Sequence, residues 1–214
     1  MLSQEIIVFI IEVIGTVAFA SAGAMSAIKR KLDLFGIMMF GAITAVGGGM
    51  LRDILLGLNP PALFRNPTYA YIAIGVSILL FAAVRIREDL LTSKYIAVYK
   101  NIMNSADAIG LGAFTVIGVN TGYDNGYTSA FLLIALGALT GAGGGMLRDM
   151  MSGETPQIFR KHVYACASIA GAVIYIALNQ VIENAAAMII GAISIVAIRY
   201  LSAKYEWNLP KAIR

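Results

Sequence analysis

The sequence has little of the material from which disulfide frameworks, metal centres and most active sites are built. Its 214 residues include one cysteine, Cys166, and one histidine, His162. A single cysteine excludes a disulfide within the chain, and one Cys with one His leaves no cluster spaced like metal ligands. No nucleophile motif is evident either. An enzyme is therefore disfavoured, and no cofactor is expected.

Charge is also scarce. Only 13% of the residues are charged and 59% are hydrophobic, with a mean hydropathy of +0.79, whereas soluble domains carry about 25% charged residues. This composition predicts an integral membrane protein. No cleavable signal peptide is evident, because the N-terminus lacks a basic region and its first apolar run is long. The net charge of +4 is interpreted as a topology signal, not as affinity for nucleic acid.

Apolar runs long enough to cross a bilayer, about 20 residues each, predict seven transmembrane helices in an all-α fold. Prolines, a turn at 124–126 and a polar stretch at 85–100 separate them. The expected spans are 5–28, 34–57, 68–86, 101–120, 127–151, 162–180 and 184–203. Tyrosines near the span ends, Tyr69 and Tyr164 among them, are interpreted as an aromatic belt at the membrane interface.

One heptapeptide occurs twice, letter for letter. The first motif is Gly47-Gly48-Gly49-Met50-Leu51-Arg52-Asp53, and the second motif is the same seven residues at 143–149. Flanking positions match at an offset of 95, including Glu12 with Asp107. Residues 1–90 therefore form one repeat of three helices, 91–180 a loop and a second repeat, and 181–214 a seventh helix and a tail. Because three spans is an odd number, the second repeat must be inverted in the membrane.

Lysines and arginines predict the orientation. With the N-terminus outside, thirteen of them fall on the inner side and only Arg65 on the outer side, the two motif arginines being excluded as intramembrane. The inner set is Lys29, Arg30, Lys31, Arg85, Arg87, Lys94, Lys100, Arg160, Lys161, Arg199, Lys204, Lys211 and Arg214. The excess of inner positive charge predicts an outside N-terminus and a cytoplasmic C-terminus.

Three consecutive glycines weaken a helix by about 1 kcal/mol each relative to alanine, so we expect the second and fifth helices to break at the two motifs. Helix rise places the two breaks on opposite sides of the midplane, about 10 Å apart. Intramembrane charges by default mark a pathway and have a partner. From their depths we expect Glu12 to pair with Arg52, and Asp107 with Arg148. Adjacent helical residues point about 100° apart, so in each motif Arg and Asp are expected to face different surroundings.

A polar pathway between the repeats is the functional interpretation of these features. Freed carbonyls and carboxylates suit hard cations such as K⁺ or Na⁺, held transiently at the breaks without a fixed metal site. The candidate pathway residues are Gly47, Gly48, Gly49, Arg52, Asp53, Gly143, Gly144, Gly145, Arg148, Asp149, Glu12, Asp107, Thr44 and Thr140. The alternative is that the glycines only let helices pack closely and the motif arginines extend to the interface as anchors.

The doubled Gly-Gly-Gly-x-x-Arg-Asp motif, the three-plus-three-plus-one helices and the expected orientation resemble the prokaryotic branch of the trimeric intracellular cation (TRIC) channels. The resemblance covers about residues 5–203. It implies a homotrimer in the prokaryotic inner membrane, in contact with lipid, with an hourglass pore in each protomer. It also implies that kinked second and fifth helices flank this pore and that K⁺ and Na⁺ permeate. By motif match, it assigns the glycines, Arg and Asp of both motifs to the pore.

Two other functions stay open. Some bacterial relatives with this architecture have been proposed to move glycine, and broken helices are also typical of alternating-access transporters. In a transporter, Arg52 or Arg148 would hold the substrate carboxylate, and Glu12 or Asp107 the ammonium group. A purely structural membrane protein would instead tolerate the loss of the motif charges.

Overall fold

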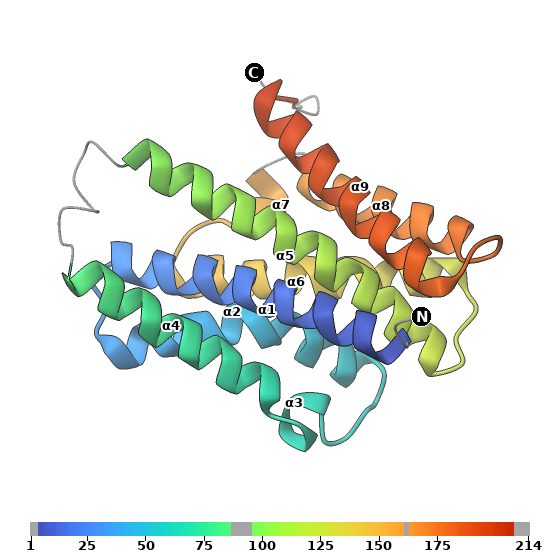
Figure 1. Cartoon of the computed structure of the whole chain (residues 1–214), viewed down its shortest axis with the longest axis horizontal. Helices are drawn as coiled ribbons and strands as arrows, with labels where there is room; N and C mark the ends of the chain where they lie inside the picture. The colour runs from blue at the N-terminus through green and yellow to red at the C-terminus, as the bar shows by residue number, and fades with distance from the viewer. Residues whose placement is uncertain (1–3, 87–95, 161–162, 208–214) are drawn as a thin grey trace.

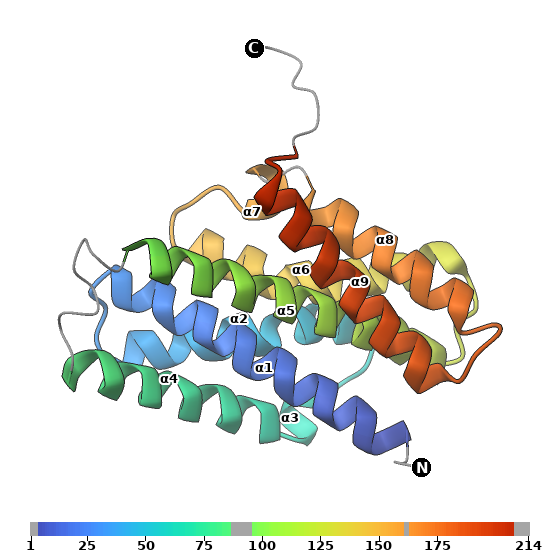
Figure 2. The ribbon, with the colours of Figure 1, turned by 45° about the horizontal axis from the view of Figure 1, so that its top comes forward.

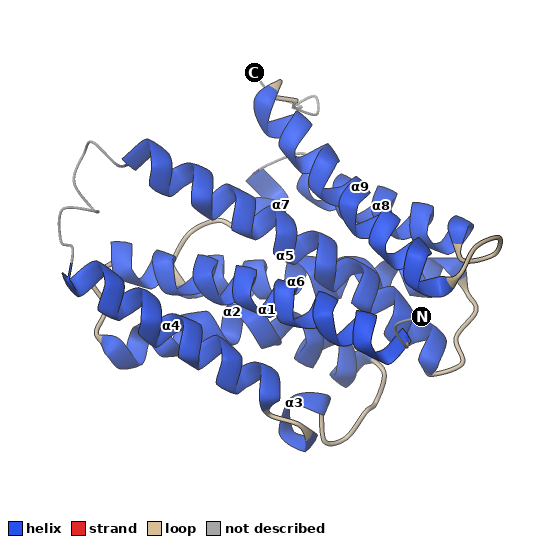
Figure 3. Ribbon diagram, in the orientation of Figure 1, coloured by secondary structure: helices blue, strands red, loops and turns tan. Residues whose placement is uncertain are grey.

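The structure is a computed structural model that describes residues 4–86, 96–160 and 163–207. Over these ranges every regular element is a helix (Figure 3). The helices are α1 (Gln4–Lys29), α2 (Leu34–Leu55), α3 (Ala62–Arg65), α4 (Thr68–Ile86), α5 (Ile96–Asp124), α6 (Ala130–Met151), α7 (Gln157–Arg160), α8 (Tyr164–Leu178) and α9 (Asn184–Lys204). Among the described residues, six helices are long and apolar enough to span a bilayer. The chain is thus a multi-pass membrane protein.

The observed helices match the expected spans closely. The sixth span, expected at 162–180, is α8, which has 15 residues and is shorter than the other spans. The sequence did not predict the four-residue helices α3 and α7. Most of the polar stretch at 85–100, together with His162, Lys161, Lys211 and Arg214, lies outside the described residues, so the expectations placed on them are untested.

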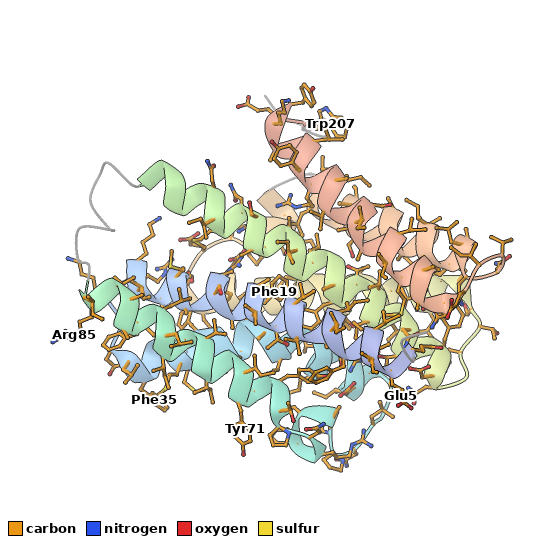
Figure 4. The ribbon with its side chains drawn as sticks, in the orientation of Figure 1. Glu5, Phe19, Phe35, Tyr71, Arg85 and Trp207 are labelled. Atoms are coloured by element: carbon orange, nitrogen blue, oxygen red, sulfur yellow. The ribbon has the colours of Figure 1, made fainter. Side chains whose placement is uncertain are left out.

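The long helices pack as two groups joined side by side. α1, α2 and α4 contact one another, as do α5, α6 and α8, while α1–α5 and α2–α6 contacts join the groups. Figures 1 and 2 show α1 and α5 next to each other, running in opposite directions, with α4 on one flank and α8 and α9 on the other. Figure 4 places Phe19 in the middle of the bundle, whereas Phe35 and Tyr71 point outward and are 66% and 69% exposed.

The motif glycines lie inside continuous helices, so the predicted interruption of the second and fifth helices is wrong. α2 stays helical from Leu34 to Leu55, and α6 from Ala130 to Met151. The glycines serve close packing instead. A Cβ atom built on Gly48 would lie 2.1 Å from the carbonyl oxygen of Thr140, and one on Gly144 would lie 2.0 Å from that of Thr44. Only glycine allows the two backbones to approach so closely.

The predicted separation of the two motifs is also wrong. A Cβ atom on Gly143 would lie 3.1 Å from the Cα of Gly48, and one on Gly48 would lie 3.2 Å from the backbone nitrogen of Gly144. The motifs therefore meet at their middle glycines, where α2 crosses α6. Helix rise gave each motif its own depth, but it carried no information on where the two helices touch.

Both motif helices end in the same way. Gly57 and Gly153 follow α2 and α6 with φ of +70° and +66°, the left-handed conformation that glycine adopts without strain. The N–H of Leu58 donates to the carbonyl of Asp53 at 2.9 Å, and that of Glu154 donates to the carbonyl of Asp149 at 3.0 Å. This is the Schellman pattern of helix termination. It directs the chain after each motif toward α3 and α7.

Contacts around the bundle centre are reciprocal. The rings of Phe19 and Phe114 lie 5.4 Å apart, centroid to centroid. A Cβ atom on Gly15 would lie 3.0 Å from the side chain of Ala113 and 3.1 Å from that of Phe114, and one on Gly110 would lie 2.0 Å from that of Phe19. Since these positions match at an offset of 95, each half presents the same residues to the other. The division at residues 90 and 180 stays a prediction.

Candidate functional site

Two clusters of charged side chains lie at the ends of the two motif helices, and their members correspond at offsets of 95 or 96 in the sequence. The first cluster consists of Glu12, Arg52, Asp53 and Tyr69. The second cluster consists of Asp107, Arg148, Asp149 and Tyr164. The helix ends described above position both clusters, because each motif Arg-Asp pair comes just before the Schellman turn.

In the first cluster, the Asp53 carboxylate binds both the adjacent Arg52 and the start of helix α3. Arg52 donates from Nε and Nη2 to Asp53 Oδ1 at 2.9 and 2.7 Å. Asp53 Oδ2 accepts from the N–H of Ala62, the first residue of α3, at 2.8 Å. Arg52 and Asp53 are 7% and 1% exposed. The expectation that these neighbours face different surroundings is wrong, because the long arginine side chain folds back onto the carboxylate.

Glu12 has a different partner from the expected one. Its carboxylate accepts a hydrogen bond from the hydroxyl of Tyr69 on α4. Among the described residues, the ion pair of Arg52 is with Asp53 and none joins it to Glu12, so the predicted Glu12–Arg52 pair is wrong. Tyr69, expected in the aromatic belt, thus contacts an intramembrane carboxylate.

A cavity of about 250 Å³ adjoins the first cluster. Glu12 and Arg52 both line it, so the depth argument correctly placed them in one polar region although no ion pair joins them. Further lining residues are Thr16, Gly49, Tyr69 and Thr140. The cavity therefore extends from the cluster on α1, α2 and α4 to α6 of the other half.

The second cluster contains the predicted ion pair. Arg148 Nη1 donates to Asp107 Oδ1 at 3.0 Å, which confirms the pairing expected from depth. Arg148 Nε also donates to Asp149 Oδ1 at 2.9 Å, and Asp149 Oδ2 accepts from the N–H of Gln157, the first residue of α7, at 2.8 Å. Asp149 thus repeats the dual role of Asp53. Arg148 is 1% exposed and Asp107 is 2% exposed, so this arginine cannot be a snorkelling anchor.

Two residues join the second cluster that the sequence did not assign to it. Tyr164 is 2% exposed and lies under the guanidinium of Arg199, whose Cζ is 4.6 Å from the ring centroid. Arg199 Nη2 also lies 3.8 Å from Asp107 Oδ2. The sequence pattern alone puts Tyr164 in the aromatic belt and Arg199 among the inner-side topology residues. Two signals were present: Tyr164 corresponds to Tyr69 at offset 95, and Arg199 falls within the expected span 184–203.

A second cavity, of about 290 Å³, lies beside Arg148 and Asp149. At its edge Arg30 and Glu154 form an exposed ion pair of 2.6 Å, which links the end of α1 to the loop after α6. The hydroxyls of Ser26 and Ser152 lie 3.2 Å apart in the same region. This cavity is lined by charged side chains from both halves.

Thr44 and Thr140 lie at the crossing, whereas Gly49 lines the first cavity and Gly145 lies beside Tyr164 of the second cluster. Thr44 and Thr140 are 0% and 1% exposed, and their hydroxyls donate to carbonyls of their own helices, each at 2.6 Å. Thr140 also lines the first cavity. The crossing at Gly48 and Gly144 packs backbone on backbone. The arrangement thus offers polar, charged cavities on α2 and α6 and a tight constriction where these helices cross. Among the described residues, no group of three or more His, Cys, Asp or Glu could hold a metal ion.

Sequence comparisons match this chain over nearly its whole length. A family model described as "Glycine transporter" matches residues 9–85 and 104–180. The UPF0126 inner membrane protein YadS of Escherichia coli K12 is 32% identical over 208 residues, which are 95% of this chain and 95% of that protein. A UPF0126 membrane protein of Vibrio cholerae is 33% identical over 207 residues, covering 95% of this chain and 82% of that protein.

Comparison with solved structures gives the same coverage. The crystal structure of a prokaryotic TRIC channel in 0.5 M KCl matches with a TM-score of 0.85 and 29% identity, over 96% of this chain and all of that one. A structure described for conductance through TRIC cation channels matches with a TM-score of 0.81 and 32% identity, over 96% and 97% of the two chains. The trimeric intracellular cation channel orthologue of Rhodobacter sphaeroides matches with a TM-score of 0.83 and 29% identity, over 94% and 98%.

Proposed function

This chain belongs to the family of the prokaryotic TRIC channels and the UPF0126 membrane proteins, and from that premise we propose that it is a cation channel. The observation that carries the proposal is the pair of charged cavities on α2 and α6, on a fold shared with TRIC cation channels. Charged side chains inside a membrane protein mark a conduction path by default. Here they gather at two places, separated by a constriction.

We propose that the pathway runs from the first cavity, past the glycine crossing, to the second cavity. Its shape is an hourglass whose waist lies at Gly48 and Gly144. Permeant K⁺ or Na⁺ would meet the Glu12 carboxylate in the first cavity and the carboxylates of the second cluster at the other end. Both ions prefer oxygen ligands that bind weakly enough to release them. The waist is packed in this structure, so conduction requires α2 and α6 to separate there.

We propose that the two halves, 1–90 and 91–180, are inverted repeats and that the N-terminus lies outside. The antiparallel course of α1 and α5 and the reciprocal Phe19–Phe114 contacts support the inverted relation. The orientation rests on the excess of lysine and arginine at the predicted inner side. Labelling single cysteines placed near residues 65 and 204 with an impermeant reagent on intact cells tests it.

We propose a homotrimer in contact with membrane lipid. The Rhodobacter sphaeroides orthologue is described as trimeric, and the outward faces of the helices carry many exposed apolar side chains. The mass of the complex in mild detergent, corrected for bound detergent, tests the assembly. A stable monomer would contradict it.

Recording from the purified protein in a planar bilayer tests the channel. With a KCl gradient across the membrane, we expect unitary currents that reverse near the K⁺ equilibrium potential. Gly48→Leu supplies the matched variant, because its side chain would fill the waist and is expected to abolish the current. Silence of the wild-type protein, or equal currents from Gly48→Leu, would contradict the proposal.

Glycine transport is the second candidate, and one observation favours it directly. The family model that matches both halves is described as "Glycine transporter", and each cluster combines an arginine with carboxylates, which together suit a zwitterion. Saturable uptake of radiolabelled glycine into proteoliposomes, without unitary currents in the bilayer, would support this function and exclude the channel.

A further inference from the structure

The two clusters hold corresponding residues but differ in how open they are. Glu12 and Tyr69 are half-buried and line a cavity, whereas their counterparts Asp107 and Tyr164 are each 2% exposed. The tyrosine hydroxyls of the two clusters also differ in their hydrogen bonds. Tyr69 donates to Glu12, while the hydroxyl of Tyr164 has no hydrogen-bond partner within the described part of the chain. Something covers the second cluster that has no equivalent at the first.

Arg199 is the residue that makes this difference. It comes from α9, which is the one long helix of the described ranges without a counterpart in the other half, and α9 packs on α5 and α8. Its guanidinium lies over the Tyr164 ring at 4.6 Å and faces Asp107 Oδ2 at 3.8 Å, and it is 6% exposed. Arg148 already occupies the other oxygen, Oδ1, at 3.0 Å. Both oxygens of Asp107 therefore face an arginine.

The charge balance follows from this placement. The first cluster has two carboxylates and one arginine, and thus keeps an excess of negative charge that attracts cations. The second cluster has two carboxylates and, with Arg199, two arginines. A permeant cation would find no unpaired carboxylate there, because a protein cation already stands at that position.

We propose that Arg199 is a tethered counter-ion that keeps the second cluster closed and is displaced when that end of the pathway opens. The inference rests on the proposed pathway between the clusters. Arg199 suits this role better than Arg148 does. Its 3.8 Å contact with Asp107 is longer than a hydrogen bond, and among the described groups its Nε has no partner. It can leave Asp107 without breaking the shorter bonds of Arg148.

Single-channel recording of Arg199→Gln in symmetric KCl tests the role in conduction. We expect the wild-type current to differ between the two voltage polarities. In Arg199→Gln we expect this rectification to fall and the open probability to rise about tenfold, equivalent to about 1.4 kcal/mol. Arg199→Lys keeps the charge and is expected to restore wild-type behaviour. Arg85→Gln removes an exposed charge at the end of α4 that lines neither cavity, and it should change neither property.

Two results would overturn the inference while leaving the channel intact. One is a conducting wild-type protein whose rectification and open probability are unchanged in Arg199→Gln. The other is a lysine variant that behaves like the glutamine variant, since a purely structural role of the arginine shape would give that result. A wild-type protein without current would instead contradict the proposed function, and the experiment below then decides on Arg199 independently.

Thiol accessibility measures the opening of the second cluster without any current. In a Cys166→Ala background, Thr140→Cys reports on the first cavity, and Met103→Cys reports on the second cavity, one helical turn before Asp107 on α5. A positively charged, membrane-impermeant methanethiosulfonate reagent present on both sides of the membrane is expected to modify Thr140→Cys regardless of residue 199. It should modify Met103→Cys several-fold faster when Arg199 is glutamine. Equal rates at Met103→Cys with arginine and with glutamine would refute the closing role.

Discussion

Replacing Gly144 by alanine puts a methyl group where the backbones of α2 and α6 touch. The new Cβ would lie 2.0 Å from the carbonyl oxygen of Thr44 and 3.1 Å from its carbonyl carbon. Ordinary van der Waals contacts of a Cβ begin at 3.4 Å. Because the opposing atoms are backbone, no side-chain rotation can relieve the overlap, and the two helices must move apart by more than an ångström.

The magnitude follows from two opposing effects. Overpacking a tight site costs about 1–3 kcal/mol, and a contact against rigid backbone belongs at the upper end of that range. Alanine offsets about 1 kcal/mol of this through its better helix propensity. The net expectation is a loss of about 2 kcal/mol, which for a chain of this size lowers the midpoint of thermal unfolding by about 4–8 °C.

Thermal unfolding in detergent, followed by circular dichroism, measures this effect against a close control. At Gly49 the nearest heavy atom to a built Cβ is Arg52 Nη2 at 3.8 Å, and at Gly75 no atom lies within 4 Å. Alanine at these two positions is expected to leave the midpoint unchanged or to raise it. If Gly144→Ala melts at or above the temperature of Gly49→Ala, the glycines do not serve close packing, and our explanation of the continuous helices fails.

Three further changes test the clusters by the same unfolding assay. Arg148→Ala leaves the buried Asp107 carboxylate without this ion-pair partner and should destabilise the protein by about 3–5 kcal/mol. A loss below about 1 kcal/mol would mean that the Arg148–Asp107 pair is not buried as described. Tyr69→Phe removes the hydrogen bond to the half-buried Glu12 and should cost about 1–2 kcal/mol, with an unchanged midpoint as the contrary result. Glu154→Gln breaks an exposed ion pair and should cost less than about 1 kcal/mol, whereas a larger loss would show that this pair carries part of the fold.

The helices could be predicted from the sequence because their signals are local. Apolar length defines each span, and glycine at residues 57 and 153 ends α2 and α6. The short helices α3 and α7 could not be found in this way, since four residues give no periodic pattern. They depend on hydrogen bonds from their first N–H groups to Asp53 and Asp149, which lie eight or nine residues earlier in the sequence.

The function of the glycines could not be predicted from one helix alone. A glycine run reduces helix propensity and also permits close packing, and the sequence favours neither effect over the other. The partner decides, and for Gly48 that partner is the carbonyl of Thr140, ninety-two residues away. Packing against another helix restored the helical backbone that propensity disfavoured.

Depth along the membrane predicted the Asp107–Arg148 ion pair correctly and the Glu12–Arg52 pair wrongly. Depth places two groups at a common level but does not say which way their side chains point around their helices. Asp107 and Arg148 face each other, while Arg52 turns to the adjacent Asp53 and Glu12 is bound by Tyr69 on α4. Counting Arg199 as a topology signal hid a buried contact, because the positive-inside rule ignores where along a helix end a charge lies.

The seventh helix explains why the two ends of the proposed pathway need not behave alike. If the two halves had the same residues in the same contacts, the two ends of the pathway would be equivalent. Without a further helix, both ends would then open with equal ease. α9 packs chiefly on α5 and α8, and it therefore adds an arginine to the second cluster alone. The inequality is thus built into the chain by an element outside the repeat. A conduction path with one persistently charged, accessible end and one end neutralised by a displaceable arginine can be gated at a single place, next to Asp107.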